Sequence, residues 1–200
     1  MHWSSRRSTH GLTVNTLRAF LFLHDVCSPS GAHCQPWTFV VVQSAELKHK
    51  IRLAVEAEEQ RNYDRRMRRT WVADVNPLVD NLHSADGGVT KPYLDDAPFL
   101  IIVMKQVRAP GSGCDGAACD SALFARPMVQ VHGVDAAGNR VEHYYPAESC
   151  GIAVGMLVTA LHNANLSTLT STPMGAERAI RELCGRPDNE KVFLLLPVGT

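Results

Sequence analysis

Residues 28–42, "SPSGAHCQPWTFVVV", place a loop of small, turn-forming residues directly before a run of aromatic and β-branched residues. The run at positions 37–42 is typical of a buried strand. Ser, Pro and Gly at positions 28–31 indicate a turn. The stretch therefore predicts a loop that is held at the entrance of a core strand, and it raises the question of what such a loop binds.

Helix and strand patterns continue on both sides of this stretch. Apolar residues recur at helical spacing over residues 14–26, and Ser44 is placed to cap a helix that follows the strand. Residues 97–105 and 191–199 predict two further buried strands, whereas residues 148–164 predict a helix that is apolar nearly all round and therefore central. This mixture favours a layered α+β or α/β domain.

Size and composition indicate one compact domain of 200 residues. The 20 basic and 20 acidic side chains balance, so the net charge points neither to nucleic acid nor to an anionic membrane. We find no apolar run of transmembrane length and no signal peptide, and therefore expect a soluble chain that is cytoplasmic by default. The 6 cysteines lack the spacing of a disulfide framework, which favours reduced thiols.

Two motifs in the segment 106–140 favour an ordinary loop over a binding site. Residues 111–116, "GSGCDG", fit the glycine pattern of dinucleotide sites, but no strand and crossover helix flank them in the required way. Cys114 and Cys119 lack a second pair of metal ligands, so we expect no metal site. The high content of Gly, Ala, Asp and Pro predicts a mobile surface loop.

Two polar segments are candidates both for a binding site and for ordinary surface. Arg6, Arg7 and Ser8 suit a phosphate, because two guanidinium groups and a hydroxyl offer several donors, but the pair of arginines is also an ordinary solvated charge cluster. Residues 168–173, "TLTSTP", offer hydroxyls and backbone donors after the central helix. Taken alone, they are a polar loop.

The second half of the helix after Ser44 is almost wholly charged, "EEQRNYDRRMRR". Glu59 and Tyr63 are spaced i, i+4 and so share a helix face. A solvated surface is the ordinary interpretation. Together with Lys91, however, they offer a carboxylate for an ammonium group, and an ammonium and a phenol for a carboxylate, which are the two ends of an amino acid. Spacing alone does not decide between these interpretations.

The opening stretch resembles the nitroreductase superfamily of flavoproteins, whose members carry a Pro-Ser loop followed by Gln-Pro-Trp and a strand. Its Gly-Ala-His version is similar to the members that remove iodine from tyrosine reductively. The resemblance runs from Arg6 to Gly199, is interrupted by inserts near residues 83–90 and 111–130, and includes the segments "LKHKIR", "EEQRNYDRRM", "KPYLDDAP", "HYYPAES", "LHNANLSTLTSTP" and "EKVFLLLPVG".

This resemblance implies an α+β fold, with a mixed sheet flanked by helices, in a homodimer that holds FMN at the subunit interface. It implies reductive deiodination of 3-iodotyrosine and 3,5-diiodotyrosine to tyrosine and iodide, with electrons from NADPH, directly or through a reductase. Two alternatives stay open: a general nitroreductase or quinone reductase, and a non-catalytic relative that only binds halotyrosine. The animal relatives are membrane-anchored, so a longer form of this chain would also be a candidate for a membrane.

The resemblance also implies roles for individual residues. The residues that would hold FMN are Arg6, Arg7, Ser8, Pro29, Ser30, Gly31, Thr170, Ser171 and Thr172. Thr172 would bond the flavin N5, and the backbone N–H of Ala32 would face the substrate phenolate. A small loop suits that task, because it lets a backbone donor approach an anion closely. The residues that would bind the zwitterion are Glu59, Tyr63 and Lys91, in a segment that we expect to be a mobile lid.

Two departures from the family pattern concern the FMN phosphate. His10 stands where the resemblance implies a further arginine. A C-terminal tail with another phosphate-binding arginine is implied beyond Thr200, and it is absent from the 200 residues. Because fewer cations would face a dianionic phosphate, we expect this chain to bind FMN less tightly than the full set of arginines would allow.

Overall fold

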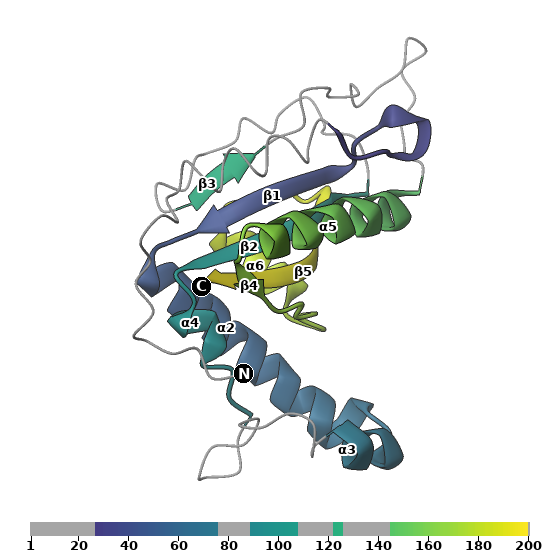
Figure 1. Cartoon of the computed structure of the whole chain (residues 1–200). Coiled ribbons are helices and arrows are strands. Elements are labelled where there is room, and N and C mark those ends of the chain that lie inside the picture. Colours follow the sequence, from purple (N-terminus) through teal and green to yellow (C-terminus); the bar gives the residue numbers. More distant parts are fainter. Residues whose placement is uncertain (1–26, 76–88, 108–121, 126–144, 200) are drawn as a thin grey trace.

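The computed structural model describes residues 27–75, 89–107, 122–125 and 145–199. Five strands form one sheet in the order β3-β1-β2-β5-β4 (Figure 1). Their bounds are Trp37–Val42 for β1, Phe99–Gln106 for β2, Ala122–Ala125 for β3, Ser167–Thr168 for β4 and Glu190–Gly199 for β5. The α+β class that the resemblance implies is confirmed.

All strand pairs within the described residues are antiparallel, whereas a mixed sheet was expected. The pairing of β1 with β2 shows the physical reason. Val42, the last residue of β1, lies opposite Leu100 near the start of β2. The connection between the two strands therefore leaves and re-enters the sheet at the same end, which forces the strands to run in opposite directions.

Helices cover both faces of the sheet (Figure 1). The helix α5, Pro146–Asn163, covers one face, and α2, α4 and α6 lie on the other side. The bounds of these three helices are Ala45–Arg61, Tyr93–Asp96 and Glu177–Leu183. Phe39 and Val41 pack into the cluster under α5, while Val40 and Val42 pack into the other cluster. Because side chains alternate along a strand, the continuous apolar run of β1 supplies both halves of the core.

Most of the predicted elements are present, with one correction. The strands expected at 97–105 and 191–199 and the helix expected at 148–164 are confirmed as β2, β5 and α5. The side chain of Ser44 accepts a hydrogen bond from the N–H of Leu47, as an N-cap does. The prediction of a loop over 106–140 is wrong for Ala122–Ala125, which pairs with β1 as β3. The predicted helix at 14–26 lies outside the described residues.

The far half of α2 extends past the sheet toward two short helices (Figure 1). They are the π-helix η2, Asn62–Arg66, and α3, Arg69–Val75. Within the described part of the chain, no helix is long and apolar enough to cross a membrane. The charged segment from Glu58 to Arg69 is thus largely helical, and it is called the helical arm below.

A buried ion pair lies at the start of β5, and a hydrogen bond from Thr38 connects it to β1. The guanidinium of Arg186 donates from Nε to Glu190 Oε2 at 2.7 Å and from Nη2 to Oε1 at 2.6 Å. The hydroxyl of Thr38 donates to the same Oε1 at 2.9 Å. Because the side chains of Arg186 and Glu190 are only 5% and 2% exposed, losing the arginine would leave a buried carboxylate without its main partner.

Arg186→Ala is therefore expected to lower the free energy of unfolding by about 3–5 kcal/mol, measured by urea denaturation. The control is Arg178→Ala, because Arg178 forms an exposed i, i+4 pair with Glu182, and we expect no shift of the midpoint there. Equal midpoints for both variants and the unmodified chain would contradict this account of the β5 start.

Candidate functional site

Glu59, Tyr63 and Lys91, called the clamp below, come together at the end of α2. The ammonium Nζ of Lys91 lies 3.1 Å from Glu59 Oε1, and the two side chains are 10% and 13% exposed. Tyr63 is partly buried in η2, where the charges of both partners act on its phenol. The structure thus assembles the three residues from two segments that are about thirty positions apart in the sequence.

The helix changes from an α-helix to a wider π-helix at Asn62, between the positions of Glu59 and Tyr63. Glu59 belongs to the last turn of α2, and the N–H of Met67 donates to the carbonyl of Asn62 at 3.0 Å, five residues back. Such π-turns inside helices occur frequently at functional sites. The i, i+4 spacing predicted a shared face but not this change of helix type.

The pKa values of the clamp keep Lys91 charged and Tyr63 neutral. Burial alone would lower the pKa of Lys91, but Tyr93 and Glu59 outweigh burial and raise it. Burial raises the pKa of Tyr63, and the charge of Glu59 adds to this effect. An ammonium donor, a phenol donor and a carboxylate acceptor therefore share one partly buried corner, which matches the needs of a zwitterionic ligand.

Tyr93 is a member of this corner that the sequence analysis missed. Its ring centre lies 5.9 Å from Lys91 Nζ, and its hydroxyl lies 3.3 Å from the hydroxyl of Ser171. Ser171 is held in place by two backbone hydrogen bonds with Leu195, of 2.9 and 2.8 Å. One cue in the sequence could have pointed to Tyr93, because it follows the predicted site residue Lys91 by two positions. Tyr93 therefore links the clamp to the polar loop at 168–173.

Asn62 makes a second link between the clamp and that loop. Its side chain is almost fully buried, and its Nδ2 donates to the carbonyl of Met174 at 2.8 Å. Gly175 follows with a φ of +94°, and a Cβ at this position would lie 2.7 Å from Glu58 Oε2. The side-chain ends of Glu58 and Arg66 can move, but a φ of +94° strains any residue that has a Cβ, so the position favours glycine. Thr170 and Thr172 stay exposed on the same loop.

The loop at residues 28–36, called the opening loop, exposes backbone N–H groups before β1. Residues Gly31–His33 form a short 3-10 turn in which Ala32 and His33 have positive φ angles of 49° and 54°. The N–H of Gly31 donates to Ser149 Oγ at the start of α5, at 3.0 Å. Ala32 is exposed, and its N–H has no acceptor among the described residues. A non-glycine residue in this conformation is strained, and such strain clusters at functional sites.

The opening loop and the clamp do not meet within one chain. The loop precedes Trp37 at one end of β1, whereas α2 leaves from Val42 at the other end. A strand of this length spans about 20 Å at roughly 3.3 Å per residue. Figure 1 shows the dark purple turn of the loop and the far end of α2 on opposite sides of the sheet. The predicted phosphate ligands Arg6, Arg7 and Ser8 lie outside the described residues.

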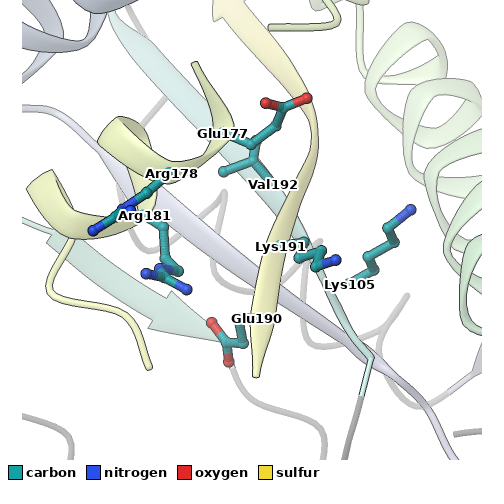
Figure 2. Close-up of a pocket in the computed structure, with 7 residues that line it drawn as sticks. All are labelled: Lys105, Glu177, Arg178, Arg181, Glu190, Lys191 and Val192. Carbon is teal, nitrogen blue, oxygen red and sulfur yellow. The ribbon is translucent and has the colours of Figure 1, made fainter. Parts of the chain in front are cut away.

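A separate cavity of about 570 Å³ lies beside the start of β5. Figure 2 shows its lining, which comprises Lys105, Glu177, Arg178, Arg181, Glu190, Lys191 and Val192. None of the residues predicted for FMN or substrate is among them. Glu190 is already engaged by the buried pair described above. The cavity is therefore distinct from the clamp and from the opening loop.

Known proteins share both the sequence and the fold of this chain. Residues 16–200 match the nitroreductase family. The chain is 42% identical over 172 residues to iodotyrosine deiodinase 1 of Mus musculus, in a match that covers 86% of this chain and 50% of that protein. The protein of the same name in Homo sapiens is also 42% identical over 172 residues, with coverages of 86% and 49%. The chain thus spans about half the length of these curated relatives.

A crystal structure of oxidized iodotyrosine deiodinase bound to FMN and 3-iodo-L-tyrosine superposes with a TM-score of 0.64 and 23% sequence identity. The match covers 94% of this chain and 78% of that chain. At this identity the superposition establishes the fold, and the family match over most of the chain adds the sequence relationship. The chain therefore belongs to the nitroreductase family.

Proposed function

We propose that this chain carries out FMN-dependent reductive deiodination of 3-iodotyrosine and 3,5-diiodotyrosine, with tyrosine and iodide as products and electrons from NADPH. The observation that carries the proposal is the clamp, in which a largely buried pair of opposite charges and a phenol lie near a hydroxyl-rich loop. The names of the relatives that are 42% identical support this choice of substrate.

The clamp would recognise the amino acid end of the substrate. Glu59 would accept from the ammonium group, while Lys91 and Tyr63 would donate to the carboxylate. In the chain alone, Lys91 and Glu59 satisfy each other at 3.1 Å. A zwitterion inserted between them would replace one ion pair by two, which is why we expect a simple phenol or amine to bind weakly. The opening and closing of this segment as a lid stays a prediction.

The described residues fit FMN at two places. Exposed Thr170 and Thr172 would line the ring, with Thr172 donating to N5, and Ser171 would be held by Tyr93 and Leu195. Pro29, Ser30 and Gly31 would support the cofactor from the opening loop, while Arg6, Arg7 and Ser8 would hold the phosphate. When bound and reduced by electrons from NADPH, FMN would supply the two electrons that replace iodine by hydrogen, which also consumes one proton and releases iodide. Ala32 would donate its N–H to the phenolate, where a preorganised donor stabilises negative charge.

A homodimer would complete this site. The opening loop of one chain and the clamp of its partner would enclose one FMN, because the two lie on opposite sides of the sheet within a chain. The outer face of α5 supports an interface. Ile152 is 47% exposed there, and a Cβ built at Gly151 or Gly155 meets no atom of the described residues within 4 Å. A second copy could approach this apolar, small-residue face closely.

The test is an anaerobic titration of the purified, FMN-loaded protein. After chemical reduction of the flavin, addition of 3-iodotyrosine is expected to restore the oxidised flavin spectrum with one iodide released per flavin. Reoxidation by nitroaromatic compounds or quinones with no preference for iodotyrosine would favour the general reductase instead. Colourless protein that binds iodotyrosine without releasing iodide would favour the non-catalytic relative.

A further inference from the structure

We propose that Glu56 and Gln60 are positioning residues that hold the backbone at Lys91, so that its ammonium group selects ligands with a carboxylate. The inference rests on the proposed function, because it assigns a purpose to the amino acid clamp. Neither side chain belongs to the clamp itself. Both lie on α2, one turn apart, and both accept hydrogen bonds from the backbone of the segment that ends at Lys91.

The two hydrogen bonds match in geometry. The N–H of Lys91 donates to Glu56 Oε1 at 2.5 Å, and the N–H of Val89 donates to Gln60 Oε1 at 2.9 Å. Residues four apart in a helix are separated by about 6 Å along its axis. Alternate residues of an extended segment are separated by roughly 6.5 Å. Glu56 and Gln60 thus accept from two N–H groups that lie on the same side of an extended segment, those of Lys91 and Val89. This segment runs antiparallel to α2.

Both acceptors are themselves oriented by further hydrogen bonds. Arg52 donates from Nε to Glu56 Oε1 at 2.6 Å and from Nη1 to Asp95 Oδ2 at 2.9 Å, which ties α2 to α4. Gln60 Nε2 donates to Asp64 Oδ1 at 3.0 Å, so its oxygen is the end of the amide that faces Val89. The side chains of Arg52 and Glu56 are only 22% and 14% exposed. This network holds the segment on both sides of Lys91.

The consequence for the ligand follows from the position of Lys91. The residue comes directly after the insert near residues 83–90, so its place depends on contacts with α2 rather than on a short connection. With its backbone held by Glu56, the side chain reaches Glu59 on the same helix. A held ammonium group loses less conformational entropy when it binds a carboxylate than a free lysine would. Glu56 therefore acts on carboxylate recognition through Lys91.

The experiment compares two ligands that differ only in the carboxylate, 3-iodotyrosine and 3-iodotyramine, by calorimetric titration of the FMN-loaded protein. We expect Glu56→Ala to weaken iodotyrosine binding by about tenfold or more, as for loss of a hydrogen bond to a charged group. Binding of iodotyramine should change by less than about twofold, because it makes no use of Lys91. Glu56→Gln keeps an acceptor for the Lys91 N–H and should restore part of the preference.

The matched control is Glu46→Ala, since Glu46 is on the same helix and forms an exposed pair with Lys50. It should leave both affinities unchanged. If Glu56→Ala does not fold, Gln60→Ala tests the same point, because it removes only the bond to Val89 and should also lower the preference. A preference for iodotyrosine that is intact in folded Glu56→Ala and Gln60→Ala would overturn the inference.

The outcome separates this inference from the proposed function. Unmodified protein that binds both ligands equally would overturn the clamp assignment and, with it, any role of Glu56 in carboxylate selection. A different result is an unmodified protein that prefers iodotyrosine, with the preference lost in Lys91→Ala but kept in the Glu56 and Gln60 variants. That result would contradict this inference and leave the proposed function standing. A purely structural role of Glu56 would weaken both ligands to the same extent, which also contradicts it.

Discussion

Lys91→Ala is expected to lower the affinity for 3-iodotyrosine by about a hundredfold or more, measured by calorimetric titration. Two effects add in the same direction. The ligand carboxylate loses a charge-assisted hydrogen bond in a partly buried site. In addition, Glu59, which is 13% exposed, loses the ammonium group that lies 3.1 Å away. Truncating one member of such a pair costs far more than truncating an exposed pair.

The matched control is Lys50→Ala on α2, the helix that carries Glu59. Lys50 pairs with Glu46 at 2.6 Å, but the two side chains are 54% and 78% exposed. We expect unchanged affinity there, because exposed pairs of this kind contribute little. Iodotyrosine affinity that stays within about threefold in folded Lys91→Ala would mean that the ligand carboxylate lies elsewhere and that the clamp is a structural ion pair.

Gly155→Arg should give a folded, monomeric protein without bound FMN. A Cβ at Gly155 meets no atom of the described residues within 4 Å, so the chain itself has room for the larger side chain. Arginine also favours a helix over glycine by roughly 0.8 kcal/mol, which leaves the fold of the monomer intact. A buried, charged side chain at the proposed interface would instead prevent association. Without the partner, half of the proposed FMN site is missing.

Light scattering after gel filtration would measure the mass, and absorbance in the flavin region would measure FMN. The control is Ala179→Arg, which places the same side chain on the exposed face of α6. That variant should stay dimeric and yellow. A Gly155→Arg protein that remains a yellow dimer would place the interface on another face, whereas a yellow monomer would show that one chain is sufficient to hold FMN.

Several elements were predictable because their signals are local. The β-branched run of β1, the apolar runs of β2 and β5 and the apolar length of α5 each follow from a few neighbouring residues. The Ser44 cap is equally local. The strand β3 was missed, because four ordinary residues in a segment rich in turn formers become a strand only when they pair with β1.

The clamp residues were predictable from the sequence, but the residues that support them were not. Glu59 and Tyr63 were selected by spacing, and Lys91 was joined to them because its ammonium group suits a carboxylate. The resemblance then implied that the three residues bind the zwitterion. The residues that support Lys91, namely Glu56 and Gln60, have no distinguishing pattern, because polar and charged residues are frequent along that helix. Tyr93 was missed for a similar reason: its contact with Ser171 joins positions 78 residues apart. Such roles depend on which backbone lies against which side chain.

By itself, the amino-acid sequence determined the order of the main strands and helices, the small opening loop and the charged character of the helical arm, since hydrophobic pattern and turn chemistry act over a few residues. Only the tertiary structure decided that Lys91 meets Glu59, that Asn62 and Tyr93 join the clamp to the hydroxyl loop, and that the opening loop lies across the sheet from both. The physical reason is that hydrogen bonds and ion pairs between distant segments form only after the core has set the relative positions of the helices and strands.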